Sequence, residues 1–562
     1  MVDLKGKPFC LQEEEIAWIE KTMTEMTLEE KIGQLFCPIG LSTDREELKE
    51  KYLKYHIGGI MFRDQESGKE IAQIHNFLQE NSKIPLLLAA NLESGGNGIA
   101  KDGTNYGCQM LVAATNEAEY AYELGKISAR EGAACGCNWA FAPVADIDYN
   151  FRNPITNIRT YGSDAKRVEE MTCAYMRGVM ECGMAVAAKH FPGDGIDERD
   201  QHIVTSVNSL SCEEWDNTYG NVYRRLITEG AMTIMVGHIA LPAYQKEMNP
   251  GGEKILPATL SEELLQGLLR KKLGFQGVIS TDATQMVGFC CAMKREEAVP
   301  LSIERGCDVF LFHHSLEEDY QFMLNGYKKG LLSKKRLEEA VTRILALKAA
   351  LKLPQKQKEH SLVCLETVET VVGCPEHVKA AKEVAQKGVT LVKDTQGLLP
   401  LSVKRYPRLL LQVMENNGQK RELEQQFKEL FEAEGFQVSL YTQEEGVVFC
   451  TEKTADFISS YDLVVYIMNI ENKSNHTTCR IQWDTTYAGN NQPWFVEELP
   501  TMMISLANPY HLLDAPMIKT YINAYCNSPY TREAVLEKVM GRSTFQGISP
   551  IDAFCGREDT RS

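Results

Sequence analysis

Between residues 55 and 350 the sequence repeats one pattern, and this pattern limits the folds that are open to the chain. Each repeat has a short apolar run, then a loop with Gly, Asp, His or Asn, and then an amphipathic segment with charged residues at helical spacing. Such alternation of strand and helix favours a parallel sheet covered by helices. The apolar runs are nearly continuous, as in strands that are buried on both faces. The runs are 57–61, 85–90, 140–144, 185–189, 231–236, 277–280 and 308–312.

This series of strands and helices predicts an α/β fold with a TIM-like (β/α)8 barrel in the first part of the chain. A helical pattern over residues 336–351 closes the region, and a polar stretch that contains a proline follows it. We therefore expect a barrel domain over residues 1–352, a linker over 353–376 and a smaller α/β sandwich domain over 377–562. The expected strands of this second domain are 409–413, 436–440, 463–467 and 502–506.

Composition and charge narrow the classes of function. The 60 Lys and Arg residues against 77 Asp and Glu residues give a net charge of −17, which repels a nucleic-acid backbone. The sequence has neither an apolar run of about 18 residues nor a signal-peptide core at its start. The 17 cysteines are scattered, and the closest pairs lack the CxxC spacing of a zinc site. We expect a cytoplasmic protein without nucleic-acid or membrane partners, metal or other cofactor; the sequence does not define its oligomeric state.

Polar side chains follow the predicted barrel strands at the point where each strand ends. In a barrel the carboxyl ends of the strands meet at one face, and their loops build the active site there. The alternative explanation is that loops are polar in any protein, and it accounts for part of the set. The residues are Asn91, Glu93, Asp146, His190, His238, Asp282 and His313.

Two segments contain the residue types that acid/base and nucleophilic catalysis require. In the first, Asp200 lies two residues before His202, so that its carboxylate can turn back onto the imidazole. This contact fixes the tautomer of the ring and favours its charged form, as a general acid/base near neutral pH requires. In the second, an apolar strand delivers Asp282 at its carboxyl end, where it is a candidate nucleophile. From local sequence alone, a solvated loop and a helix-capping Asp282 are the simpler interpretations.

The segment Lys189-His-Phe-Pro-Gly-Asp-Gly195, followed after four residues by Asp200-Gln-His202, resembles a family signature at every fixed position. The family is glycoside hydrolase family 3, in the branch of the β-N-acetylglucosaminidases. Further matches in family order are found at 27–35, 138–146, 157–164, 236–239, 257–261 and 277–282. The second domain resembles the α/β sandwich of the same family at 383–393, 397–401 and 547–551.

The resemblance implies a retaining mechanism in which Asp282 attacks the anomeric carbon and forms a covalent glycosyl-enzyme. It also implies that His202, oriented by Asp200, protonates the leaving oxygen and then activates the incoming acceptor. In retaining enzymes the two catalytic groups lie about 5 to 5.5 Å apart, so the loop with His202 has to fold over the barrel mouth.

The resemblance further implies which residues surround the bound sugar. These are Arg159, Lys189 and His190, with Asp146 and His238 nearby. One segment departs from the family: where Asp-x-Glu-Gly-Gly-Arg is usual, this chain reads Asn91-Leu-Glu93-Ser-Gly-Gly-Asn97. An amide offers both a donor and an acceptor, so we expect Asn91 still to bind a sugar hydroxyl at the barrel mouth, next to Glu93.

The expected reaction is the hydrolysis of terminal, non-reducing β-linked N-acetylglucosamine from a small carbohydrate. A phosphorylase is the first alternative, because a histidine that acts as a neutral base does not repel a phosphate acceptor as a carboxylate would. A β-glucosidase or β-xylosidase is disfavoured by the His202 loop, which marks the N-acetylhexosaminidase branch. A catalytically silent sugar-binding protein is disfavoured because Asp282, Asp200 and His202 are all present.

Overall fold

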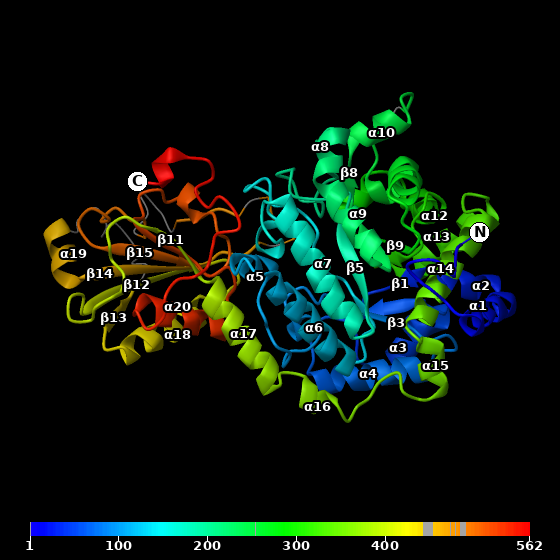
Figure 1. The fold of residues 1–562 in the computed structure, drawn as a ribbon, viewed down its shortest axis with the longest axis horizontal. Coiled ribbons are helices and arrows are strands. Elements are labelled where there is room, and N and C mark those ends of the chain that lie inside the picture. The colour runs from blue at the N-terminus through cyan, green and yellow to red at the C-terminus, as the bar shows by residue number, and fades with distance from the viewer. Residues whose placement is uncertain (1, 253, 442–452, 473, 478, 484–490) are drawn as a thin grey trace. The chain divides into compact units, whose positions relative to one another are not determined.

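The structure, a computed structural model, describes residues 2–252, 254–441, 453–472, 474–477, 479–483 and 491–562 (Figure 1). Its contacts divide the chain into two compact units. The first unit consists of Met1–Tyr106 and Ala118–Lys379, and the second of Gly107–Glu117 and Ala380–Ser562. Each unit is built on its own β-sheet.

The first unit is built on a curled, parallel six-stranded sheet with the order β2-β3-β4-β5-β7-β9. Two further parallel pairs are formed by β1 with β10 and by β6 with β8. Isolated parallel bridges also join Ile39 to Met61 and Ser280 to Val309. The strands are β1 (Phe36–Cys37), β2 (Gly59–Met61), β3 (Leu87–Ala90), β4 (Trp139–Ala140), β5 (Ala185–Phe191), β6 (Ser206–Val207), β7 (Thr233–Val236), β8 (Ile239–Ala240), β9 (Val278–Thr281) and β10 (Phe310–Leu311).

Burial explains why these strands could be recognised in the sequence. Every residue of the six-stranded sheet is buried, so most of its residues are apolar and the strands stand out in the sequence as apolar runs. All seven predicted runs overlap a strand of the structure, which confirms them. The strand β1 was not predicted, because its two residues follow helix α2 (Leu28–Gln34) without a polar break.

Helices follow the strands along the chain and surround them in Figure 1. Several begin at a local signal: Thr27, Ser67 and Ser211 each close a capping box with a Glu three residues later. Up to residue 350, the helices of this unit other than α2 and short 3-10 helices are α1 (Glu13–Glu25), α3 (Arg45–Lys51), α4 (Gly68–Glu80), α6 (Ala118–Ala134), α7 (Ala165–Glu181), α8 (Cys212–Asn217), α9 (Tyr219–Glu229), α10 (Pro242–Met248), the π-helix Glu263–Lys272, α11 (Val287–Cys290), α12 (Arg295–Glu304), α13 (Leu316–Lys328) and α14 (Lys334–Ala350).

The stretch 353–376, expected as a linker, forms helices α15 (Leu353–Lys358) and α16 (Val368–Val371) and belongs to the first unit. The physical reason is apolar burial: Val363 and Val368 pack against Ala72 of α4. Helix α17 (Pro375–Gly388) follows directly.

The second unit has a six-stranded sheet with the order β11-β16-β15-β14-β12-β13, in which only β11 is antiparallel to its neighbour among the described strands. Apolar side chains cover both faces, as in a three-layer sandwich: Phe427 of α18 packs on one face and Phe457 of α19 on the other. The elements are α5 (Gln109–Ala114), β11 (Thr390–Asp394), β12 (Arg408–Glu415), α18 (Lys420–Ala433), β13 (Gln437–Leu440), α19 (Thr454–Ser460), β14 (Leu463–Asn469), β15 (Thr501–Ser505), β16 (Thr520–Asn523) and α20 (Pro529–Val539).

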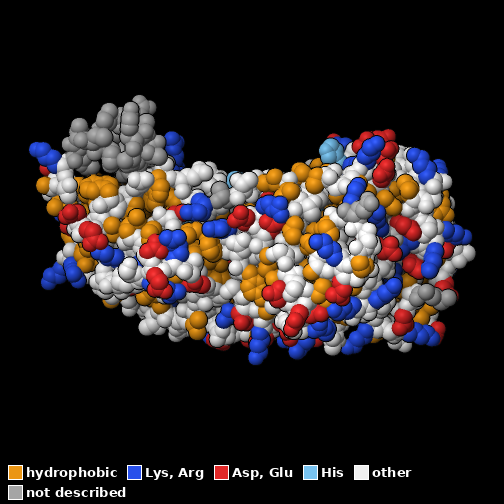
Figure 2. All heavy atoms as spheres, turned by 90° about the horizontal axis from the view of Figure 1, so that it is seen from above, with side chains coloured by type: hydrophobic (Ala, Val, Ile, Leu, Met, Phe, Trp, Pro, Cys, Tyr) orange, Lys and Arg blue, Asp and Glu red, His pale blue; other side chains and the backbone are white. Residues whose placement is uncertain are grey.

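The four strands predicted for this unit are confirmed as β12, β13, β14 and β15. The sequence did not reveal β11 and β16, because both contain polar residues that interrupt the apolar run. Acidic and basic side chains are interspersed over the face of the molecule that Figure 2 shows. In the part of the chain that the structure describes, no helix is long and apolar enough to cross a membrane.

Candidate active site

Asp282 lies directly after β9, at the carboxyl end of the curled sheet. Its backbone N–H donates to the Val236 carbonyl at 2.8 Å, and its Oδ1 accepts from the Ala283 N–H at 2.7 Å. The segment 278–291 is fully described, and its one helix, α11, starts at Val287 with Met286 as N-cap residue. The interpretation of Asp282 as a helix cap is therefore wrong.

The surroundings of Asp282 favour its ionised form. Burial would raise the pKa of this carboxyl, but the nearby imidazoles of His190, His238 and His202 outweigh burial and lower the pKa below its usual value. A carboxylate that stays charged at neutral pH is what nucleophilic attack on a sugar requires.

The predicted contact between Asp200 and His202 is present. Oδ1 of Asp200 accepts from the backbone N–H of His202 at 2.8 Å and lies 2.6 Å from its Nδ1. The Asp200 carboxylate is fully buried, whereas 23% of the His202 side chain is exposed. Because Nδ1 is held as the donor toward Asp200, Nε2 is the nitrogen that can take up and release a proton.

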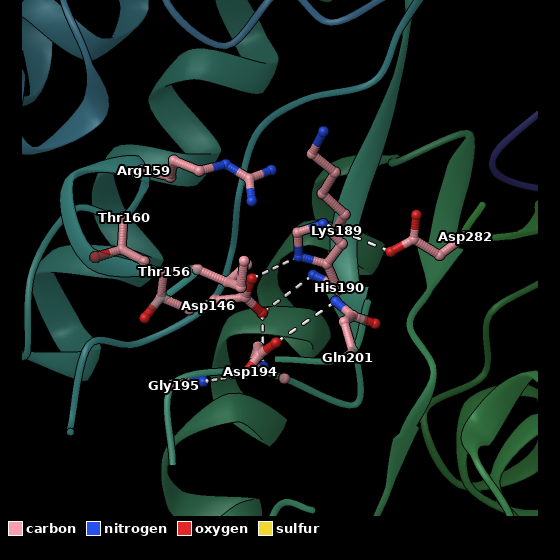
Figure 3. Close-up of polar contacts among 12 residues, drawn as sticks. Asp146, Thr156, Arg159, Thr160, Lys189, His190, Asp194, Gly195, Gln201 and Asp282 are labelled. Atoms are coloured by element: carbon pink, nitrogen blue, oxygen red, sulfur yellow. Dashed lines mark hydrogen bonds and ion pairs between the residues drawn. The ribbon is translucent and has the colours of Figure 1, made fainter. Parts of the chain in front are cut away.

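His190 lies between two carboxylates, as Figure 3 shows. Its Nδ1 is 2.6 Å from Oδ2 of Asp146, and its Nε2 is 3.8 Å from Oδ2 of Asp282. The other oxygen of Asp146 accepts the backbone N–H groups of His190 at 3.1 Å and of Asp194 at 2.8 Å. Asp146 is completely buried by these contacts. It therefore orients the His190 ring beside the candidate nucleophile.

Glu93, Arg159, Lys189 and Asn91 form one charged cluster. Glu93 accepts two parallel bonds from Arg159, both at 2.9 Å, and lies 2.6 Å from Nζ of Lys189. Lys189 Nζ is also 3.5 Å from the Asn91 amide oxygen. Burial lowers the pKa of Lys189, although Glu93 acts in the opposite direction. For Glu93, burial is outweighed by the two cations, which lower its pKa far below the usual value.

His238 has both ring nitrogens engaged within the protein. Nδ1 is 3.0 Å from the Thr259 hydroxyl, and Nε2 is 2.9 Å from the carbonyl oxygen of Ala283. The side chain is fully buried, and burial lowers its pKa. The ring thus holds the residue that follows Asp282. His313 is placed differently, since its ring packs edge-on against Tyr52 with 6.3 Å between the ring centroids.

Two buried residues of the site were not predicted, although both lie inside the signature segment. Asp194 accepts the Asn153 side chain at 2.9 Å and the Gly195 N–H at 2.7 Å. Burial, and next the charge of Asp146, raise the pKa of Asp194 to about 7. Gln201 is also completely buried. Within the described residues, no group of three or more His, Cys, Asp and Glu side chains is arranged to bind a metal ion.

Comparison with known proteins places the chain in a family. Residues 27–347 match the family model described as glycosyl hydrolase family 3 N terminal domain. The chain is 42% identical over 568 residues to the beta-N-acetylglucosaminidase/beta-glucosidase of Cellulomonas fimi, with 100% of both chains covered. The solved structure of the beta-glucoside phosphorylase BglX has a TM-score of 0.93 at 42% identity, covering 99% of each chain. A family 3 beta-N-acetylglucosaminidase from Paenibacillus sp. str. FPU-7 has a TM-score of 0.80 at 25% identity, covering 95% of this chain and 100% of that chain.

The ion-pair cluster leads to a first prediction. Glu93→Gln removes the one negative charge that Arg159 and Lys189 share, so both cations lose their position. We expect kcat/KM to fall roughly 100-fold, because small displacements of positioning groups have effects of this size. Steady-state kinetics on a nitrophenyl glycoside measures it. Glu369→Gln, which removes an exposed partner of Lys69, is the control and should change little. Unchanged kcat/KM in Glu93→Gln would contradict the positioning role.

Proposed function

The chain belongs to glycosyl hydrolase family 3, whose members act on β-linked sugars, and on this premise we propose that it releases terminal, non-reducing β-linked N-acetylglucosamine with retention of configuration. One observation supports the proposal best. The ionised Asp282 and the Asp200–His202 pair both belong to the carboxyl-end loops of one sheet, and His202 is close enough to lower the pKa of Asp282.

In the first step, the Asp282 carboxylate attacks the anomeric carbon while the bond from this carbon to the leaving oxygen breaks. Nε2–H of His202 donates its proton to that oxygen, and the sugar becomes an ester of Asp282. Asp200 stabilises the ring in the correct tautomer throughout.

In the second step, the now neutral His202 takes a proton from a water molecule. The water oxygen attacks the anomeric carbon, the ester bond to Asp282 breaks, and the free sugar leaves with its original configuration. His202 ends this step protonated and ready for the next cycle.

The sugar itself is proposed to contact the residues whose polar groups are not all used by the protein. Asp146 and His238 are not proposed to contact the sugar directly. The carboxylate of Asp146 is bound by His190 and Asp194. The ring nitrogens of His238 are bound by Thr259 and Ala283. The proposed sugar contacts are Asn91, Glu93, Arg159, Lys189 and His190.

The first unit is proposed to close as a (β/α)8 barrel. Pairing of β1 with β10 supports closure, as do the bridges from Ile39 to Met61 of β2 and from Ser280 of β9 to Val309. Together with the six-stranded sheet, these contacts support a ring of eight parallel strands. Such a ring places the strand-end residues around one mouth.

Phosphate in place of water is the second candidate acceptor. The likeness to the beta-glucoside phosphorylase BglX, at 42% identity over 99% of both chains, favours it. A neutral histidine base adds no negative charge that would repel phosphate. In this reaction a protonated oxygen of phosphate gives its proton to the neutral His202 and attacks the anomeric carbon. The ester bond to Asp282 breaks, and the product is a sugar 1-phosphate.

The nucleophile can be tested directly. Asp282→Asn should abolish turnover, because an amide cannot form the ester with the anomeric carbon. A 2-deoxy-2-fluoro glycoside should label the wild-type enzyme on the peptide that contains Asp282, as mass spectrometry would show. Labelling of another carboxylate would refute the assignment.

The acid/base is tested by its dependence on the leaving group. His202→Ala should slow the cleavage of glycosides with poor leaving groups roughly 100-fold or more, since these need protonation. The first turnover of a dinitrophenyl glycoside should be affected far less. Rapid-mixing measurement of aglycone release gives both rates, and equal losses would speak against the acid role.

One panel of p-nitrophenyl β-glycosides, assayed with and without phosphate, tests both the acceptor and the preferred sugar. We expect the p-nitrophenyl β-glycoside of N-acetylglucosamine to be cleaved to free sugar in the absence of phosphate, ahead of the glucoside and xyloside. Chromatography of the products with and without phosphate measures it. If the product is a sugar 1-phosphate, and the rate of cleavage rises with phosphate concentration, the enzyme is a phosphorylase and the proposed hydrolysis is refuted. A strong preference for glucoside or xyloside would exclude N-acetylglucosamine as the principal sugar.

A further inference from the structure

The residue between the two members of the catalytic pair makes buried contacts of its own. Gln201 is 0% exposed, and its side chain reaches toward the sheet (Figure 3). Its Oε1 accepts the backbone N–H of His238 at 2.8 Å, and its Nε2 lies 3.5 Å from Oδ2 of Asp194. One side chain therefore joins the turn of residues 200–202 both to His238, just after β7, and to Asp194, in the loop after β5.

The backbone of the same turn is held by the segment that follows the candidate nucleophile. The Gly288 N–H donates to the carbonyl of Gln201 at 3.2 Å, and the Val287 N–H donates to the carbonyl of His202 at 3.0 Å. The approach is close: a Cβ added at Gly288 would lie 2.5 Å from the Gln201 carbonyl oxygen. The turn is thus fixed on one side by a side chain and on the other by backbone N–H groups.

We propose that Gln201 is a positioning residue for the acid/base step: its buried amide holds the turn that presents His202 to Asp282. The inference rests on the proposed function, since it takes the roles of His202 and Asp282 from there. Gln201 itself is not proposed to touch the substrate.

The chemistry of the amide explains why glutamine suits this position. The acceptor oxygen meets an N–H group, and the donor nitrogen meets a carboxyl, so both halves of the amide are matched to their partners. A side chain without these groups leaves the His238 N–H buried without a partner. Such an unpartnered group favours any movement of the turn that lets water reach it.

The test is Gln201→Met, which keeps the length of the side chain and removes both hydrogen bonds. We expect the first-turnover rate on a phenyl β-glycoside to fall roughly 100-fold, while the rate on the dinitrophenyl glycoside changes only a few-fold. A merely destabilised enzyme would lose both rates in proportion, because its active fraction falls for every substrate. An equal loss on both substrates, or no loss, would overturn the proposal.

The matched control is Gln79→Met. Gln79 is also buried, and it makes two bonds to the backbone of Leu86, at 3.0 and 2.9 Å, within the first unit. Its replacement removes the same groups and should lower the melting temperature without changing the ratio of the two rates. A changed ratio in this control would show that the ratio reports general destabilisation, and it would overturn the inference.

Gly288→Ala provides a second route should Gln201→Met not fold. Its added methyl group displaces the same turn from the other side, and the same selective loss on the phenyl glycoside is expected.

Failure of the proposed function can be told apart from failure of this inference. The proposed function is refuted if Asp282→Asn retains turnover or His202→Ala shows no dependence on the leaving group. If both behave as expected and the ratio in Gln201→Met and Gly288→Ala stays at the wild-type value, only the role of Gln201 is refuted.

Discussion

The Asp146 carboxylate is the group on which the candidate active site depends. Buried carboxylates are costly unless every oxygen is hydrogen-bonded, and Asp146 meets this condition through His190 and Asp194. The Asp146 carboxylate, in the loop after β4, thereby contacts both His190 at the end of β5 and Asp194 in the loop that follows β5. The ring of His190 is held beside Asp282 as a consequence, at 3.8 Å. Loss of this anion would release two loops at once.

Each acidic side chain around the site has a different set of partners, and this separates their roles. Glu93 is paired with Arg159 and Lys189, whose charges outweigh burial and lower its pKa far below the usual value. For Asp194, burial and next the charge of Asp146 raise the pKa to about 7. Asp282 is surrounded by imidazoles, so that it stays charged without a direct salt bridge to Arg or Lys among the described residues.

The turn of residues 200–202 contains the proposed acid/base pair and, between its two members, a buried glutamine. Asp200 contacts the ring of His202, while Gln201 accepts the backbone N–H of His238. Glycine at position 288 then lets the segment after Asp282 approach the same turn. The candidate nucleophile and the proposed acid/base are thus joined by one continuous set of contacts, although they come from separate parts of the chain.

The sequence by itself determined the alternation of strands and helices, because buried parallel strands are continuous apolar runs that stand out between polar loops. It also determined the contact of Asp200 with His202, which depends only on a spacing of two residues. Only the tertiary structure decided that Asp146 binds Asp194, 48 positions away, and that Gln201 binds His238, 37 positions away. Such pairs depend on where loops from different strands meet, and local sequence holds no information about that meeting.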